Sequence, residues 1–387
     1  MSSWKECKLG DIAKLSKKTW KVGDELMPYI GLEHIEESKL RLNSIGSSEN
    51  VASNKFRFQA GDTLFGKLRP YFRKVIKPNF DGVCSTDIWV LNPQKGIDKD
   101  FLFYFFANQE LVDISYSASS GTRMPRADWD FLSQTVWNIP SIEEQKAIAE
   151  VLSSLDDKID LLHRQNQTLE SIAQTFFRKW FIEETKEEWE VGILSNYIDI
   201  VDNRGKTPPF LDDETEYPII EVNALSGQSR LINYSVIKKY VTEETYNSWF
   251  RAGHPKLYDT LLSTVGSIGE IAMFLLEKGS IAQNVVALRA KNISPFYLYE
   301  NIKFMQNELK ELDIGSVQPS IKVTHLVKID FIKPDDEILK KFDEQMIDIS
   351  NKIIVNSQQI QILENLRDTL LPKLLTGEVR AEIIKKD

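Results

Sequence analysis

Two short motifs in this chain contain residue types that act on nucleotides in enzymes. Thr207-Pro208-Pro209-Phe210 is similar to the (Asn/Asp)-Pro-Pro-aromatic motif of adenine methyltransferases. Its first residue is threonine, so the side-chain amide or carboxylate that would hold the target amino group is missing. Gly205-Lys206-Thr207 matches the end of a phosphate-binding P-loop, but Ile200 stands where that motif needs a glycine. Because neither motif is complete, we expect no catalytic centre in this chain.

The histidines and cysteines do not follow a metal-binding pattern. Ligand sets for zinc repeat histidine or cysteine at short, regular spacings. The four histidines, His34, His163, His254 and His325, are far apart in the sequence. With Cys7 and Cys84 as the only cysteines, neither a disulfide framework nor a cysteine-type zinc site is available. We therefore expect neither a metal nor a cofactor in this chain.

A cluster of basic residues in the first third of the chain points to nucleic-acid binding. Between Lys55 and Lys77 there are seven basic residues and one acidic residue, although the net charge of the whole chain is −9. A local patch matters more for phosphate binding than the overall charge does. Loop arginines and lysines bind DNA phosphates and reach base edges, whereas a solvated surface is the alternative interpretation. The candidate DNA contacts are Lys67, Arg69, Arg73 and Lys74 in this cluster, and Arg123 and Arg126 in the loop after Gly121.

The chain is organised around a long helical stretch that occurs twice. Residues 141–181 recur about 194 positions later without a gap. Matching pairs are Pro140 and Pro334, Lys158 and Lys352, Gln165 and Gln359, Glu170 and Glu364, and Thr175 and Thr369. In each copy, apolar residues recur in steps of four and three over about four heptads, which is typical of a coiled coil. Each helix would be roughly 60 Å long, too long for the alternative of separate helices in two small cores.

Asn166 and Asn356 interrupt the two apolar seams. If the helices pair antiparallel with their centres level, these two asparagines face each other. A buried asparagine pair fixes helix register at some cost in stability. We therefore predict that Asn166 and Asn356 form a hydrogen-bonded pair that sets the register. Two unrelated polar positions at the solvent edge are the alternative.

The segments that precede the helices repeat one plan more loosely. Trp189 follows Trp4 by 185 positions, and Asp259 follows Asp62 by 197. The chain is therefore a tandem duplication, which predicts an α+β protein: two mixed α/β domains joined by two long antiparallel coiled-coil helices with pseudo-two-fold symmetry. The expected boundaries are 1–140 and 186–333 for the domains, and 141–185 and 334–380 for the helices. Candidate DNA contacts in the second domain are Arg204, Lys206, Ser263, Thr264, Ser267, Gln318, Ser320 and Lys322.

The chain resembles the DNA-specificity (S) subunits of type I restriction–modification systems over nearly its whole length. The residues that carry the resemblance are Gly61-Asp62-Thr63-Leu64-Phe65 with Arg69-Pro70-Tyr71, Tyr258-Asp259-Thr260-Leu261 with Gly266-Ser267-Ile268-Gly269, Ile139-Pro140 with Glu143-Glu144-Gln145, and Leu370-Leu371-Pro372-Lys373-Leu374-Leu375-Thr376-Gly377-Glu378. The second helix opens differently, with Pro334-Asp335-Asp336-Glu337.

This resemblance implies two target-recognition domains that each read one half of a split double-stranded DNA site. It also implies a subunit without a catalytic centre that holds two modification subunits. Those partners bind S-adenosylmethionine and methylate adenine, and restriction subunits that use ATP and magnesium join through them.

Two other functions remain open from the sequence: a coiled-coil adaptor that presents two protein-binding domains, and a degenerate or fused methyltransferase. The start of the chain has no apolar signal region, and its longest apolar run, Ile271–Leu276, cannot span a bilayer. We expect a soluble, cytoplasmic protein with no membrane contact.

Overall fold

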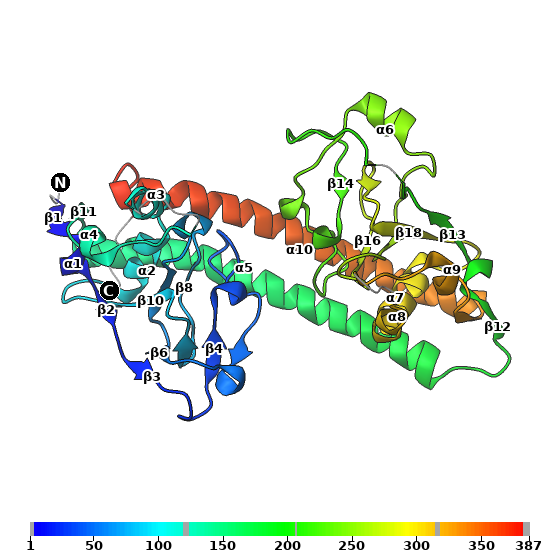
Figure 1. Ribbon diagram of the computed structural model, residues 1–387, viewed down its shortest axis with the longest axis horizontal. Coiled ribbons are helices and arrows are strands. Elements are labelled where there is room, and N and C mark those ends of the chain that lie inside the picture. The colour runs from blue at the N-terminus through cyan, green and yellow to red at the C-terminus, as the bar shows by residue number, and fades with distance from the viewer. Residues whose placement is uncertain (1–3, 119–123, 206, 314–317, 382–387) are drawn as a thin grey trace, which may run out of the picture. The chain divides into compact units, whose positions relative to one another are not determined.

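The computed structural model describes residues 4–118, 124–205, 207–313 and 318–381. The chain forms two compact units (Figure 1). Unit 1 contains the residues up to Asp160 together with those from Gln359 onward, and unit 2 contains Leu161–Gln358. Each unit therefore combines one mixed domain with a section of both long helices. This grouping differs from the sequence-based boundaries because the helix sections pack into the domain cores.

The two long helices are α5, Ile142–Phe177, and α10, Asp336–Thr376. At ~1.5 Å per residue they are roughly 54 Å and 62 Å long. The hydroxyl of Ser141 accepts a hydrogen bond from Glu144 N and so satisfies a free amide at the start of α5. A π-helical turn, Arg178–Glu183, follows the end of α5.

Within unit 2, the sections of α5 and α10 pack antiparallel along their apolar seams. Trp180 lies against Phe342, with 5.9 Å between ring centroids. Farther along, Asn356 Nδ2 donates a hydrogen bond to Asn166 Oδ1 at 2.8 Å, and Asn356 is fully buried. The structure thus contains the asparagine pairing that the seams predict. The effect of this pair on register stays a prediction.

Unit 1 builds its domain from short strands and helices. The strands are β1 Lys5–Lys8, β2 Ala13–Ser16, β3 Thr19–Trp20, β4 Pro28–Ile30, β5 Gly46–Ser47, β6 Lys55–Phe58, β7 Thr63–Gly66, β8 Val75–Ile76, β9 Gly82–Cys84, β10 Ile88–Pro93 and β11 Val136–Ile139. The helices are α1 Leu9–Ile12, α2 Lys99–Ala107, α3 Gln109–Ser117 and α4 Trp129–Leu132, with 3-10 turns at Leu32–His34, Ser48–Asn50 and Pro70–Phe72. The central antiparallel sheet has the order β2-β10-β7-β8, a second sheet the order β3-β6-β9-β4-β5, and β1 pairs with β11.

Unit 2 repeats this arrangement. Its strands are β12 Glu190–Ile193, β13 Ile198–Val201, β14 Ile219–Ile220, β15 Thr260–Ser263, β16 Ile271–Met273, β17 Ser280–Ile281, β18 Val285–Ala290 and β19 Asp330–Lys333. The helices are α6 Glu243–Trp249, α7 Pro295–Phe304, α8 Gln306–Glu311 and α9 Val323–Leu326, with 3-10 turns at Leu194–Asn196, Val222–Ala224 and Tyr234–Val236. The sheet order β13-β18-β15-β16 matches β2-β10-β7-β8, and β12 pairs with β19 as β1 pairs with β11. The predicted duplication of a mixed α/β domain is confirmed.

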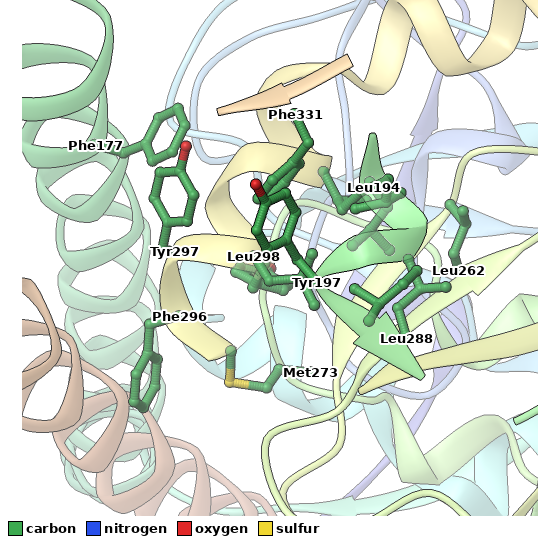
Figure 2. Packing of buried hydrophobic residues seen from close by; sticks show 14 of the residues in the cluster. Phe177, Leu194, Tyr197, Leu262, Met273, Leu288, Phe296, Tyr297, Leu298 and Phe331 are labelled. Carbon is green, nitrogen blue, oxygen red and sulfur yellow. The ribbon is translucent and has the colours of Figure 1, made fainter. Parts of the chain in front are cut away.

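In both units a helix that is rich in buried aromatic residues fills the space between the central sheet and the long helices. In unit 1 this helix is α2, where every residue of Phe101–Ala107 is buried in one core with Ile148 of α5 and Leu371 of α10. In unit 2 it is α7, and Figure 2 shows Tyr297 of α7 facing Phe177 of α5. The mixed domain and the helix pair therefore share one core in each unit.

Among the described residues, none of the helices combines the length and apolar character that crossing a bilayer requires.

Candidate nucleic-acid interface

Two segments of unit 1 that are far apart in the sequence lie side by side at the end of the hairpin β7–β8. Arg69 N donates to Pro125 O at 2.7 Å, and Ala127 N donates to Lys67 O at 2.9 Å. We call residues 67–69 and 125–127 the first turn pair. This arrangement brings Lys67, Arg69 and Arg126, three of the predicted DNA contacts, together on one surface feature.

Unit 2 contains the same arrangement at the end of the hairpin β15–β16. Gly266 N donates to Pro319 O at 3.0 Å, and Ile321 N donates to Thr264 O at 2.9 Å. We call residues 264–266 and 319–321 the second turn pair. Gly266 has a φ of +85°, a conformation that strains any residue with a Cβ, and Gln318 lies beside it. Gly266–Gly269 lies in the tight turn that connects β15 and β16.

The first turn pair carries positive charge that is largely free for a partner. In the part of the chain that the structure describes, neither Lys67 nor Arg69 forms an ion pair. Arg126 Nε lies 3.2 Å from Asp87 Oδ1, but its side chain remains 52% exposed. Arg69 and Arg73 both have left-handed backbone conformations, with φ of 51° and 48°, on either side of Pro70–Phe72. Such residues persist only where surrounding contacts hold them, and they are common at binding sites.

Arg73 does not belong to this exposed set. Its side chain is 9% exposed, and its Nη2 lies 2.9 Å from Asp368 Oδ1 on α10. Burial alone would raise the pKa of Asp368, but Arg73 and Arg367 outweigh it and hold the pKa below its usual value. Lys74 is also mostly buried and donates to Leu32 O at 2.8 Å. The assignment of Arg73 as a DNA contact is corrected: this arginine ties the turn to the helix. Lys74 has little surface left for DNA.

Two candidates in unit 2 are also corrected. Ser263 and Thr264 are fully buried. The Ser263 hydroxyl donates to Ser267 O at 2.6 Å and accepts from Glu270 N at 2.8 Å. Both residues therefore shape the turn from inside and do not face a ligand. No sequence pattern distinguishes such a serine from an exposed one.

The other candidates in unit 2 differ in how free they are. Ser267, Gln318 and Lys322 are exposed at or beside the second turn pair, and Ser320 is half-buried. Arg204 is exposed, but Asp202 neutralises it through hydrogen bonds of 2.5–2.9 Å. Arg123 and Lys206 lie outside the described residues. The second turn pair thus presents hydroxyl and amide groups where the first presents cations.

The described residues contain no group of three His, Cys, Asp or Glu side chains placed to hold a metal ion.

Known proteins with the same features are DNA-specificity subunits. Residues 1–171 match the family model of the type I restriction modification DNA specificity domain. The chain is 24% identical to the HindI specificity subunit of Haemophilus influenzae, over 98% of this chain and 100% of that protein. It is 27% identical to the MjaIX specificity subunit of Methanocaldococcus jannaschii, over 75% of this chain and 71% of that protein. Residues 1–171 therefore belong to the DNA specificity domain family of type I restriction–modification systems, and over the whole chain the similarity is to S subunits. As an S subunit, it is a DNA-recognition component without a catalytic centre.

A solved structure supports the same fold. The S subunit of a type I restriction–modification system from M. genitalium superimposes with a TM-score of 0.56. The two chains are 16% identical, and the alignment covers 96% of each. At this identity the likeness concerns the fold alone.

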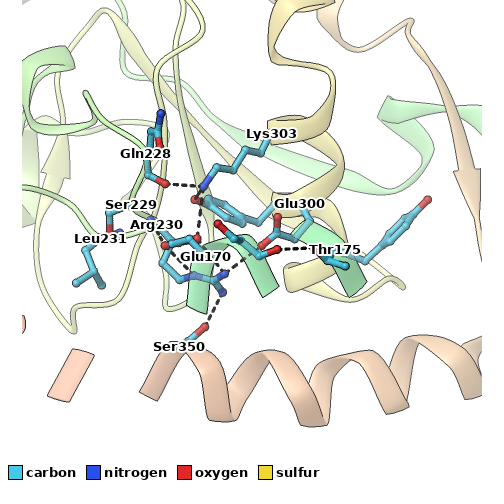
Figure 3. Close-up of polar contacts among 12 residues, drawn as sticks. Glu170, Thr175, Gln228, Ser229, Arg230, Leu231, Glu300, Lys303 and Ser350 are labelled. Atoms are coloured by element: carbon cyan, nitrogen blue, oxygen red, sulfur yellow. Dashed lines mark hydrogen bonds and ion pairs between the residues drawn. The ribbon is translucent and has the colours of Figure 1, made fainter. Parts of the chain in front are cut away.

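The sequence analysis missed one set of charged residues in this S subunit. Arg230 is fully buried in unit 2 and contacts Glu170 of α5 and Glu300 of α7 (Figure 3). In unit 1, Lys39 contacts Glu364 of α10 at 2.6 Å. Glu170 and Glu364 occupy equivalent positions of the repeat. One signal in the sequence could have identified these two glutamates: a charged residue is retained at the same position of both helices, near an apolar seam.

The Glu143-Glu144-Gln145 opening of α5 has an internal role. Glu144 Oε2 accepts a hydrogen bond from Trp4 Nε1 at 3.1 Å and is ion-paired with Arg380. Gln145 Oε1 accepts from Asp98 N at 2.8 Å. Both side chains are buried. Glu144 and Gln145 are therefore used for contacts within unit 1. The different residues at the start of α10 imply a difference in internal contacts.

Proposed function

We propose that this S subunit reads a bipartite double-stranded DNA site, one half per unit, with unread base pairs between the halves. The observation that carries the proposal is the turn pair, which occurs twice on equivalent hairpins with different exposed side chains. Two copies of one scaffold that differ in their exposed loops suit two different half-sites.

The side chains of the two turn pairs favour different kinds of DNA contact. Lys67, Arg69 and Arg126 suit phosphates, and an arginine can bind guanine with two hydrogen bonds. Gln318, Ser267 and Ser320 suit base edges. A glutamine amide can form two hydrogen bonds with adenine, and a serine hydroxyl can donate to or accept from a base edge. Lys322 adds a positive charge beside them. Arg204, Arg123 and Lys206 remain predicted contacts at the edges of these sites.

We infer that two modification subunits supply the chemistry, and that restriction subunits join through them. The modification subunits would bind S-adenosylmethionine and methylate adenine, while ATP and magnesium would belong to the restriction subunits. The resemblance of the long helices and their flanking motifs to those of other S subunits supports this assembly.

Co-expression with a modification subunit of the same source, in a host that lacks adenine methylation, tests the proposal. We expect sequencing of the methylated genome to return one motif with an internal gap of unspecified bases. The chain alone should give no methylation. An uninterrupted motif, or methyltransferase activity of the purified chain, would contradict the proposal. Substitutions in the first turn pair should change only one half of the motif.

A further inference from the structure

A buried charged cluster joins the second domain to both long helices. Arg230 is fully buried, and its Nη2 lies 3.2 Å from Glu170 Oε2 on α5 and 3.1 Å from Glu300 Oε1 on α7. Its Nη1 donates to Ser350 Oγ on α10 at 2.8 Å. Lys303 Nζ completes the cluster 3.4 Å from Glu170 (Figure 3). One arginine therefore contacts three helices at once.

The same arginine is bonded to the hairpin that carries the second turn pair. Met273 N, on β16, donates to Arg230 O at 2.8 Å. β16 begins at Ile271, directly after the turn that connects it to β15. Gln306 Nε2 donates to Gly269 O at 2.7 Å on the other side of the turn. Contacts thus run without a break from Glu170 of α5 through Arg230 to the hairpin.

Unit 1 contains an equivalent set of contacts. Lys39 Nζ lies 2.6 Å from Glu364 Oε2 on α10, at the position of the repeat that Glu170 occupies on α5. The neighbouring Ser38 N donates to Phe72 O in the turn between β7 and β8 at 3.1 Å. Lys39 and Arg230 both lie on the loop that follows the 3-10 turn after β4 or β14. We call Lys39–Glu364 and Arg230–Glu170 the anchor pairs.

Burial and charge indicate that the Arg230–Glu170 pair holds geometry more than it adds stability. Glu170 is almost fully buried, which alone would raise its pKa, yet Arg230 and Lys303 keep the pKa below its usual value. A buried ion pair gains little net stability over apolar residues, but it accepts only one arrangement of its partners. Duplication of the pair at equivalent positions argues against a chance contact.

We propose that Lys39 and Arg230 are positioning residues for DNA recognition, each fixing its turn pair to the long helices through Glu364 or Glu170. The proposal rests on the proposed function, because it assigns one anchor pair to each half-site. Side chains that read bases must be held to within about 0.5 Å by the residues behind them. Loss of an anchor pair should therefore lower base discrimination in its own half of the site, although the anchor residues do not contact DNA.

The test uses the full chain assembled with modification subunits of the same source and a random double-stranded DNA library as the probe. Lys39→Met removes the charge but keeps most of the side chain, and Lys39→Arg restores the charge. We expect Lys39→Met and Glu364→Gln each to lower base discrimination in one half-site roughly tenfold. The other half should keep its wild-type discrimination, and Lys39→Arg should recover the loss.

Glu170→Gln should give the mirror result, with the loss in the opposite half-site. Lys341→Met, which breaks the exposed Lys341–Glu337 pair on α10, is the matched control and should leave both halves unchanged. Melting curves accompany every variant. If Glu170→Gln fails to fold, the result for Lys39→Met tests the proposal. The Lys39 side chain is 35% exposed, so water can solvate Glu364 after the substitution and the variant should still fold.

The outcomes separate the anchor pairs from the underlying function. A wild-type motif without two halves would overturn the proposed function itself. A bipartite wild-type motif with unchanged halves in Lys39→Met and Glu364→Gln would overturn only the positioning role. Equal loss in both halves would also overturn it, because a general loss of stability does not choose one half-site.

Discussion

At the scale of single residues, the two turn pairs differ in charge. The first carries the exposed Arg126 and the half-buried Lys67 and Arg69, while the second carries the exposed Gln318 and its neighbouring hydroxyls. Each phosphate contact releases condensed counterions, so it adds to the salt dependence of binding, whereas hydrogen bonds to base edges add little. The two half-sites should therefore contribute unequally to the response to salt.

Replacing Lys67, Arg69 and Arg126 together with alanine should weaken DNA binding by the assembled subunit. Each lost phosphate contact should reduce the slope of log affinity against log salt by about 0.9. Fluorescence anisotropy with a cognate duplex over a range of salt concentrations measures this slope. Lys17, Lys18 and Lys95 are exposed lysines elsewhere in unit 1, and their triple alanine variant is the charge-matched control. An equal change in both variants would show that only net charge matters.

Arg73→Ala should act on stability instead of salt dependence. The arginine is buried, and its loss leaves Asp368 beside Arg367 without its second partner. Breaking a buried pair costs about 3–5 kcal/mol, and the loss here should be smaller because the Asp368 side chain is 37% exposed. Chemical denaturation of the variant should show this loss. A variant with wild-type stability and weaker DNA binding would return Arg73 to the set of DNA contacts.

A pH effect should arise from Glu300. Burial raises its pKa to about 7, although Arg230 and Lys303 oppose the shift. The folded protein therefore takes up a proton, between about pH 7 and 4.5, that the unfolded chain does not bind. The stability from this group is present below about pH 4.5 and is lost as pH rises through 7. Relative to Glu300→Gln, the wild type should gain stability on acidification from pH 8 to 5, by about 1.4 kcal/mol per pKa unit. Urea titrations at each pH measure this difference, and parallel curves would contradict it.

Some site residues can be found from the sequence and others cannot. The basic cluster and the loop after Gly121 predict Lys67, Arg69 and Arg126 as candidates, because a cation on a loop needs no distant partner to remain at the surface. The burial of Arg73 depends on Asp368, which lies 295 positions later in the chain. Ser263 is buried because its own turn folds over it. Arg230 is similar: its partners come from three helices, and the sequence around it resembles a solvated loop.

At the scale of elements, the long helices are the part of the fold that the sequence predicts best. Their heptad pattern is local and repeats, so the helices follow from spacing alone, and their partner positions follow once antiparallel pairing is assumed. The short strands are harder to predict, since they gain their form from neighbours across the sheet. For example, the alternating residues of Tyr29–Ile35 are typical of one strand, but β4 ends at Ile30 and the 3-10 turn Leu32–His34 follows.

The asparagine pair gives a prediction at this scale. Asn356 is fully buried, so Asn166→Leu should leave an unpaired amide and cost ~1–3 kcal/mol. Asn356→Leu should cost less, because Asn166 is half-buried and keeps its hydrogen bond to Ser357 Oγ at 3.2 Å. The double leucine variant should be as stable as the wild type or more stable, since apolar residues then fill the seam.

Thermal denaturation of the three variants measures these differences. Additive losses in the double variant would contradict the pairing. The methylation motif supplies a second readout: if the pair sets helix register, the double variant should tolerate more than one gap length between the half-sites.

At the scale of the whole molecule, unit 1 is assembled from both ends of the chain. Leu371 and Leu374 of α10 are buried in its core beside Ile148 and Leu152 of α5. Arg380 lies over the ring of Trp4 at 5.0 Å and pairs with Glu144. In unit 2, Trp189 and Lys186 bind Asp335 in a similar way. By contrast with unit 1, unit 2 consists of one continuous stretch of chain, Leu161–Gln358.

A chain shortened to end at Gln358 should therefore lose the first unit and keep the second. Each fully buried leucine contributes roughly 1.5–3 kcal/mol, and the stability of a whole domain is only about 5–15 kcal/mol. Hydrogen exchange should show loss of protection in β7 and β10 and retained protection in β15 and β18. A chain that ends at Ala381 is the control. Protection of β7 and β10 in the shortened chain would contradict this division.

The split construction of unit 1 reverses the usual order of folding during synthesis. Domains near the N-terminus normally fold first, as the ribosome adds about 5–20 residues per second. Here the second unit is complete once Gln358 has emerged, while the first still lacks the part of α10 from Gln359 onward. From the emergence of Asp160 until Asp387 is added, roughly 10–45 s pass at that rate. During this interval Ile148 and Leu152 have no partner helix, so the nascent chain offers chaperones an apolar surface that its own last helix later covers.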